Sequence, residues 1–98
     1  MWIAVLRIDV LIPGSRSLKD RRQAVRSLKE RLRNRFDVAC NEVGDLVSWN
    51  RASLGIAAVG NEKSVLQELA DEISRYAQND PNVQVTGVER DYCNYGEA

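Results

Sequence analysis

The amino-acid sequence predicts an α+β fold in which two helices pack on one face of a small antiparallel sheet. Two observations support this prediction. Apolar residues alternate with other residues over 2–12 and 48–59, as in strands that bury one face. Apolar residues recur at three- and four-residue spacings over 18–36 and 65–77, as on one side of a helix. The 98 residues have the size of one domain.

The first strand and the first helix follow directly from this pattern. In residues 2–12 every even position is apolar, and Pro13-Gly14 then ends the strand. Ser17 is a good helix N-cap, with Asp20 three residues later in a near capping box. The following helix of about five turns carries one apolar stripe, made of Leu18, Val25, Leu28, Leu32 and Phe36.

The next two strands are joined by a turn. Residues 37–43 are rich in β-branched and small side chains and end at Gly44-Asp45, which is a turn signal. Residues 48–59 alternate, and their apolar face is formed by Ala52, Leu54, Ile56 and Ala58.

The C-terminal part adds a helix and a last strand. Asn61 is a plausible N-cap for the second helix, and residues 79–82 break the chain because a residue before proline avoids the helical region. A strand begins at Val83. Residues 92–98 show no pattern, so we expect one domain over 1–91 and a loose tail.

The order βαββαβ predicts a ferredoxin-like sandwich, a four-stranded antiparallel sheet with both helices on one face. The crossover rule places the first and third strands in its centre. The other face is then open unless a partner covers it, and it is predicted to carry Arg7, Asp9, Trp49, Arg51 and Ser53.

A combined pattern of six segments is more specific than any single element. These segments are Met1-Trp2, Ser17–Arg22, Val25–Leu28, Arg31–Phe36, Glu42–Gly44 and Trp49–Gly55. Together they resemble the YlxP-like family of small bacterial proteins. The resemblance implies a ferredoxin-like fold and no established biochemical activity. The genes of that family often lie beside genes for translation-initiation and ribosome-maturation factors, which suggests a role linked to the ribosome.

The composition argues against most classes of enzyme. The chain has no histidine, which removes histidine-based acid–base chemistry and histidine metal sites. Two cysteines cannot form a four-thiolate zinc site or an iron–sulfur cluster. We therefore expect a non-enzymatic protein with no catalytic residues, no metal and no cofactor.

The N-terminal segment and the cysteines predict a cytoplasmic protein with no membrane partner. Residues 1–10 are apolar, but Arg7 and Asp9 interrupt them and no basic region precedes them. No segment approaches the length of a membrane span. Cys40 and Cys93 stand in no metal or redox spacing, so we expect free thiols, Cys40 in the core and Cys93 near the tail.

The charge is zero only on average. Residues 16–36 hold nine of the 14 basic residues and only two acids, whereas 37–98 hold four bases and eleven acids. Five bases recur at spacings of 3, 4, 3 and 4 on one side of the first helix: Lys19, Arg22, Arg26, Lys29 and Arg33. We call these five residues the basic ladder. Such a row suits a phosphate backbone, so structured RNA is the predicted partner. The resemblance to the YlxP-like family implies that this RNA is ribosomal. The alternative is a solvated face or one that pairs with an acidic surface of another subunit.

The open sheet face suggests a different class of function. Trp49 and Arg51 are two residues apart on a predicted strand and share a face with Arg7 of the neighbouring strand. We expect these three residues to form an interface. The alternative function is therefore a homo-oligomeric protein-interaction or small-ligand regulatory module that forms a homodimer through this face.

Two weaker candidates remain. Glu42 and Asp45 form an acidic pair near a turn, where we expect turn chemistry or an ion pair with Arg51 rather than acid–base catalysis. Arg16, with Asn41 or Asn50, has the residue types used by acylphosphatases of this fold. The flanking motif is absent, so a small hydrolase is the least favoured alternative.

Overall fold

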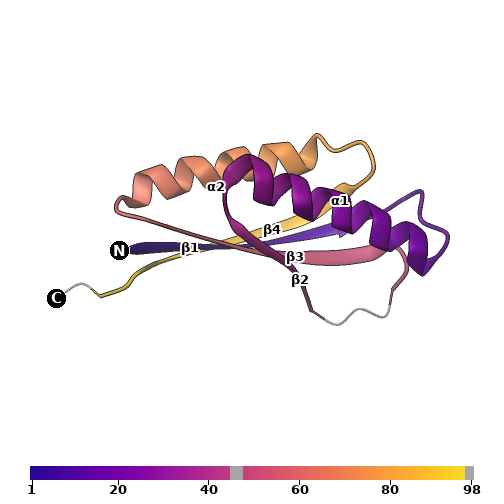
Figure 1. Ribbon diagram of the computed structural model, residues 1–98, viewed down its shortest axis with the longest axis horizontal. Helices are drawn as coiled ribbons and strands as arrows, with labels where there is room; N and C mark the ends of the chain where they lie inside the picture. The colour runs from indigo at the N-terminus through magenta and orange to yellow at the C-terminus, as the bar shows by residue number, and fades with distance from the viewer. Residues whose placement is uncertain (45–47, 97–98) are drawn as a thin grey trace.

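A computed structural model describes residues 1–44 and 48–96. Its elements are β1 (Trp2–Leu11), α1 (Leu18–Phe36), β2 (Ala39–Val43), β3 (Arg51–Gly60), α2 (Lys63–Gln78) and β4 (Gln84–Asn94). The four strands form one antiparallel sheet in the order β2-β3-β1-β4, and both helices cover the same face (Figure 1). The predicted ferredoxin-like fold is confirmed, with β1 and β3 in the centre of the sheet.

The core lies between the sheet and the two helices. The even positions of β1 and β3 face it, and their register pairs Leu6 with Ile56 and Ile8 with Leu54. The helices bury most of their apolar stripes against this face. Leu18 is 53% exposed at the start of α1, so its assignment to the buried stripe is wrong. The largest fully buried side chains are Leu6, Ile8, Leu28, Leu32, Cys40, Leu54 and Ile73. Cys40 is therefore the core residue that the sequence predicts.

The two helices begin differently. Ser17 caps α1, because its hydroxyl accepts a hydrogen bond of 3.2 Å from the backbone N–H of Asp20. The Asp20 carboxylate in turn accepts from the backbone N–H of Arg16 at 3.1 Å, which completes a reciprocal capping arrangement. The N-cap of α2 is Glu62, with no hydrogen bond from its side chain, so the prediction of Asn61 as the cap is wrong.

The expected loose tail at 92–98 is in part a strand. β4 continues to Asn94, which pairs with Trp2, and the N–H of Tyr95 donates to the carbonyl of Met1 at 2.7 Å. β4 lies at the edge of the sheet and only half of it faces the core, so polar residues occupy much of it and no clear alternation shows in the sequence. None of the described helices is long and apolar enough to span a membrane.

Candidate phosphate-binding surface on the first helix

The basic ladder lies on the flank of α1 next to the edge strand β2. Four of its residues line one groove of about 360 Å³ together with Glu42 of β2. These four are Lys19, Arg22, Arg26 and Lys29. Arg33 lies one turn further along α1 and donates a hydrogen bond of 2.7 Å to the side-chain oxygen of Asn41. The structure thus brings the predicted residues together on one surface.

Most of the ladder's charge is not used inside the protein. Lys19, Arg22 and Lys29 form no hydrogen bond or ion pair with the residues that the structure describes. Arg26 lies 3.7 Å from Glu30 in a pair whose side chains are 78% and 59% exposed. An exposed pair of this kind contributes about 0.3–0.5 kcal/mol, so a ligand can displace it.

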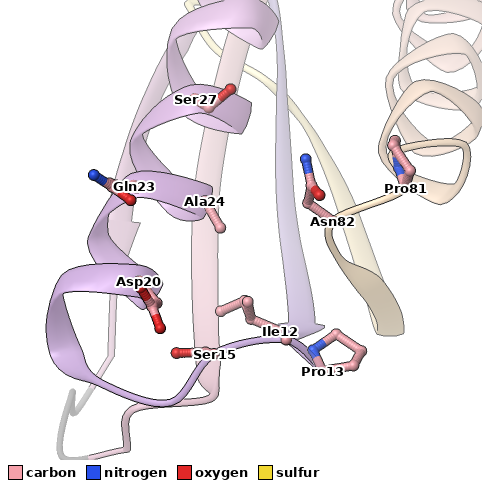
Figure 2. Close-up of a pocket in the computed structure, with 10 residues that line it drawn as sticks. Ile12, Pro13, Ser15, Asp20, Gln23, Ala24, Ser27, Pro81 and Asn82 are labelled. Carbon is pink, nitrogen blue, oxygen red and sulfur yellow. The ribbon is translucent and has the colours of Figure 1, made fainter.

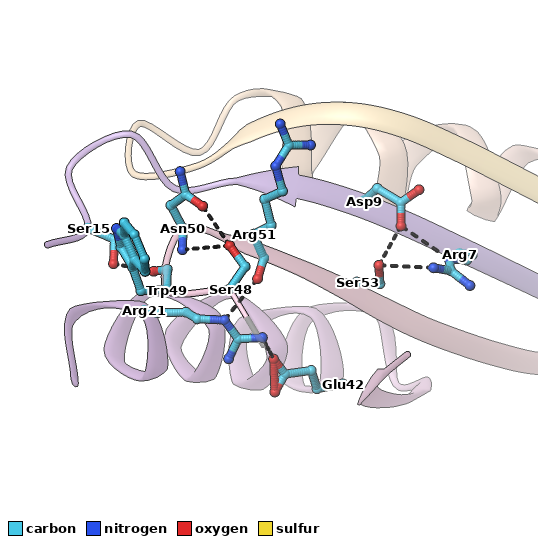
Figure 3. A network of polar contacts seen from close by, with 10 residues as sticks. All are labelled: Arg7, Asp9, Ser15, Arg21, Glu42, Ser48, Trp49, Asn50, Arg51 and Ser53. Atoms are coloured by element: carbon cyan, nitrogen blue, oxygen red, sulfur yellow. Dashed lines mark hydrogen bonds and ion pairs between the residues drawn. The ribbon is translucent and has the colours of Figure 1, made fainter. Parts of the chain in front are cut away.

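Arg21 is different from the ladder residues beside it. Its side chain is only 6% exposed, its Nε donates to the carbonyl of Arg51 at 2.8 Å, and it forms an ion pair with Glu42 (Figure 3). Arg21 therefore ties α1 to β2 and β3. The expected ion pair between Glu42 and Arg51 is wrong, because Glu42 is held by Arg21 instead. Asp45, the other member of the predicted acidic pair, lies outside the described residues.

The opposite flank of α1 uses its arginines to hold α2. Arg31 contacts Asp80 at 2.5 Å, and the carboxylate of Asp80 is only 1% exposed. The hydrogen bond to Asp80 raises the pKa of Arg31, which stays charged. The guanidinium of Arg35 lies 5.2 Å from the ring centre of Tyr76, a cation–π distance. These arginines stabilise the packing of the helices, whereas the ladder cations remain available.

One sequence signal separates Arg21 from the ladder. Arg21 stands four residues before Val25 and seven before Leu28, so helical spacing places it on the apolar side of α1. An arginine inside an apolar stripe is expected to be buried and paired. Charge alone groups Arg21 with the other eight bases of residues 16–36.

The open sheet face holds a small polar network. Arg7 lies 3.1 Å from Asp9, and the hydroxyl of Ser53 donates to the same Asp9 oxygen at 2.5 Å (Figure 3). Arg7 and Arg51 line one shallow hollow of about 290 Å³ on this face. Two of the three predicted interface residues are therefore neighbours.

Trp49 does not belong to that face. It lies in a bend before β3 begins, and its carbonyl accepts a hydrogen bond of 2.5 Å from Ser15. Figure 3 shows its ring beside Ser15 at the loop before α1, while the side chain of Arg51 points away from α1. The predicted alternation of Trp49 with Arg51 is wrong, because the strand starts at Arg51, three residues later than expected.

The network of Arg7, Asp9 and Ser53 predicts a small loss of protein stability at acid pH. The hydrogen bond from Ser53 lowers the pKa of Asp9 below its usual 3.8, against the opposing effect of burial, and Arg7 lowers it further. Since the folded-state pKa is the lower one, the stabilisation is present above about pH 4 and is lost as the pH falls through the folded pKa. We expect Ser53→Ala to raise the pKa of Asp9, measured by NMR titration of its carboxyl carbon. An unchanged pKa would contradict the assigned role of Ser53. Asp9 is 37% exposed, so the effect on stability stays below about 1 kcal/mol.

A second groove lies on the other flank of α1. It has a volume of about 430 Å³ and is formed by the loop after β1, the first half of α1 and the turn before β4 (Figure 2). Asp20 is its charged lining residue, and that carboxylate already accepts from the helix-capping N–H of Arg16. This groove lacks the cations that a phosphate needs.

The two asparagines of the hydrolase alternative are engaged elsewhere. The side-chain oxygen of Asn41 accepts from Arg33, and that of Asn50 accepts from Ser48 at 2.6 Å. No group of three or more cysteine, aspartate or glutamate side chains suited to a metal ion occurs in residues 1–44 and 48–96.

The fold and the site define a class: a ferredoxin-like domain with a cationic outer helix. Residues 3–90 match the family model described as protein of unknown function (DUF503), so the chain belongs to that family. It is 26% identical over 84 residues to "Uncharacterized protein YlxP" of Bacillus subtilis (strain 168), covering 86% of this chain and 91% of that protein. The predicted YlxP-like membership is confirmed. Among solved structures, the de novo designed ferredoxin-fold protein LFR1 1 is 12% identical with a TM-score of 0.48, covering 100% of this chain and 91% of that one.

Proposed function

We propose that the protein is a non-enzymatic binding module whose basic ladder docks on the phosphate backbone of structured RNA, with ribosomal RNA as the RNA concerned. One observation supports this most: Lys19, Arg22 and Lys29 have no partner among the described residues, although they line the same groove. Cations that stabilise the fold would be paired, as Arg21 and Arg31 are. The proposal places the protein in the cytoplasm, where ribosomes work.

The shape of the ladder suits a polyanion better than a small anion. From Lys19 to Arg33 the helix rises about 21 Å, which spans several phosphates of one strand. The groove beside the ladder offers little negative charge to repel a phosphate. Its one carboxylate, Glu42, is already paired with Arg21. Contacts to phosphate fix position without reading bases, so the expected recognition depends on shape.

The salt dependence of RNA binding distinguishes the proposed site from a basic face that is only solvated. We expect the affinity for a structured ribosomal RNA fragment to fall with salt at a log–log slope of about −3 or steeper, because about four phosphates release their counterions. Fluorescence anisotropy over a series of salt concentrations measures this slope. Heparin is the matched polyanion control, since it has the charge without the RNA shape. An absence of RNA binding at low salt would contradict the proposal, and equal affinity for both polymers would contradict the shape dependence.

A further inference from the structure

The sheet face opposite the helices has an apolar end that none of the residues described by the structure covers. Val5 is 48% exposed and Val59 is 64% exposed. The register of β1 and β3 places Ile3 beside Val59 and Val5 beside Ala57, so that these four side chains form one block. Ala39 of β2 extends the block, because it pairs with Ala57. We call these five residues the apolar block.

The charges around the apolar block do not oppose contact with an identical face. Arg7 and Asp9 already neutralise each other within the Ser53 network, so covering them leaves no unpaired charge. The register gives this face three more charged residues: Arg51 on β3, and Glu89 and Asp91 on β4. Both signs are present and nearly balance. A two-fold contact between the basic ladders of two copies would instead bring like charges together.

The size of the face is sufficient for a specific contact. β1 and β3 each have ten residues, which span about 33 Å, and four strands are about 19 Å wide. Since β2 has only five residues, the face offers roughly 550 Å² per copy, or about 1,100 Å² when two copies meet, above the roughly 1,000 Å² that a biological interface needs.

We propose that a second copy of the chain covers this sheet face in a two-fold interface, in which the apolar block supplies the hydrophobic contacts. The two sheets pack face to face and the helices of each copy lie outside. This interface differs from the one predicted from the sequence, because Trp49 lies outside it, whereas Ile3, Val5, Ala57 and Val59 form its core. It is independent of RNA binding, which uses the opposite side of the molecule.

The test compares the mass in solution of three proteins. We expect the unmodified chain of 11.0 kDa to elute with light scattering at twice that mass, and the double variant V5E/V59E at the monomer mass. Both valines are exposed in a single copy, so the charges are tolerated by the fold, which circular dichroism checks. Val65 on α2 is 55% exposed on the helical side, and V65E is therefore the matched control that stays dimeric. If the glutamates unfold the protein, the milder variant V5T/V59T takes their place. Threonine preserves the β-branched shape, and this variant should weaken the dimer at least tenfold.

Cys93 supplies an independent readout. It pairs with Ile3 beside the apolar block and is exposed, whereas Cys40 is buried and burial raises the pKa of its thiol. A thiol reagent should modify Cys93 more slowly in the unmodified protein than in V5E/V59E. An unmodified protein that is monomeric over about a hundredfold range of concentration would overturn the proposal and leave the face to a different protein. A V5E/V59E variant that remains a dimer would overturn it as well.

Discussion

Replacement of Arg22, Arg26 and Arg33 by glutamate is expected to weaken binding to structured RNA by about a hundredfold or more at low salt. Each reversal removes one phosphate contact and adds a repulsive charge. The log–log salt slope should become shallower by about 3, since one unit of slope is lost per contact. The fold should persist, because Arg22 and Arg26 are exposed and the one hydrogen bond of Arg33 among the described residues goes to the exposed Asn41.

The matched control reverses three cations that lie away from the ladder. R51E/K63E/R75E changes the net charge by the same amount, and its positions lie on β3 and α2. We expect this variant to retain most of the affinity and the full salt slope. If both triple variants lose binding equally, overall charge rather than the ladder governs association, and the proposed site is wrong.

Replacement of Arg21 by methionine should lower the free energy of unfolding by about 2–3 kcal/mol. Methionine retains the apolar stem but leaves the carbonyl of Arg51 and the carboxylate of Glu42 without their donor. Loss of one member of a buried pair costs about 3–5 kcal/mol, and we expect less here because Glu42 is 23% exposed to water. For a domain of this size the Tm should fall by roughly 10–20 °C, measured by thermal denaturation.

Arg22→Met is the control, since it changes the next residue along the helix. Its side chain is exposed and unpaired among the described residues, so stability should change by less than about 0.5 kcal/mol. RNA binding should respond in the reverse order, reduced in R22M and preserved in folded R21M. Equal stability of the two variants would contradict the structural role assigned to Arg21.

The sheet and helices were predictable because each buries one side. The even positions of β1 and the stripe of α1 reveal the core directly, and the order of elements then allows few topologies. The errors fall where the core does not constrain the chain. β4 continues along the sheet edge through polar residues to Asn94, and Trp49 continues an alternation although the chain bends there.

The site was predictable as a helix face but not residue by residue. Helical spacing alone groups the basic ladder on one flank. The partners of each arginine depend on contacts between residues distant in sequence, such as Arg21 with Glu42 and Arg31 with Asp80. The exposure of Val5 and Val59 likewise depends on the sheet having helices on one face only.

The one-sided placement of the helices has a consequence for assembly with RNA. If two sheets meet face to face, the two basic ladders lie in separate helical layers, with both sheets between them. The two ladders cannot bind one short duplex at the same time, so dimer formation gives no avidity on such a target. A dimer of this geometry instead binds two separate RNA segments, one on each ladder, and links them.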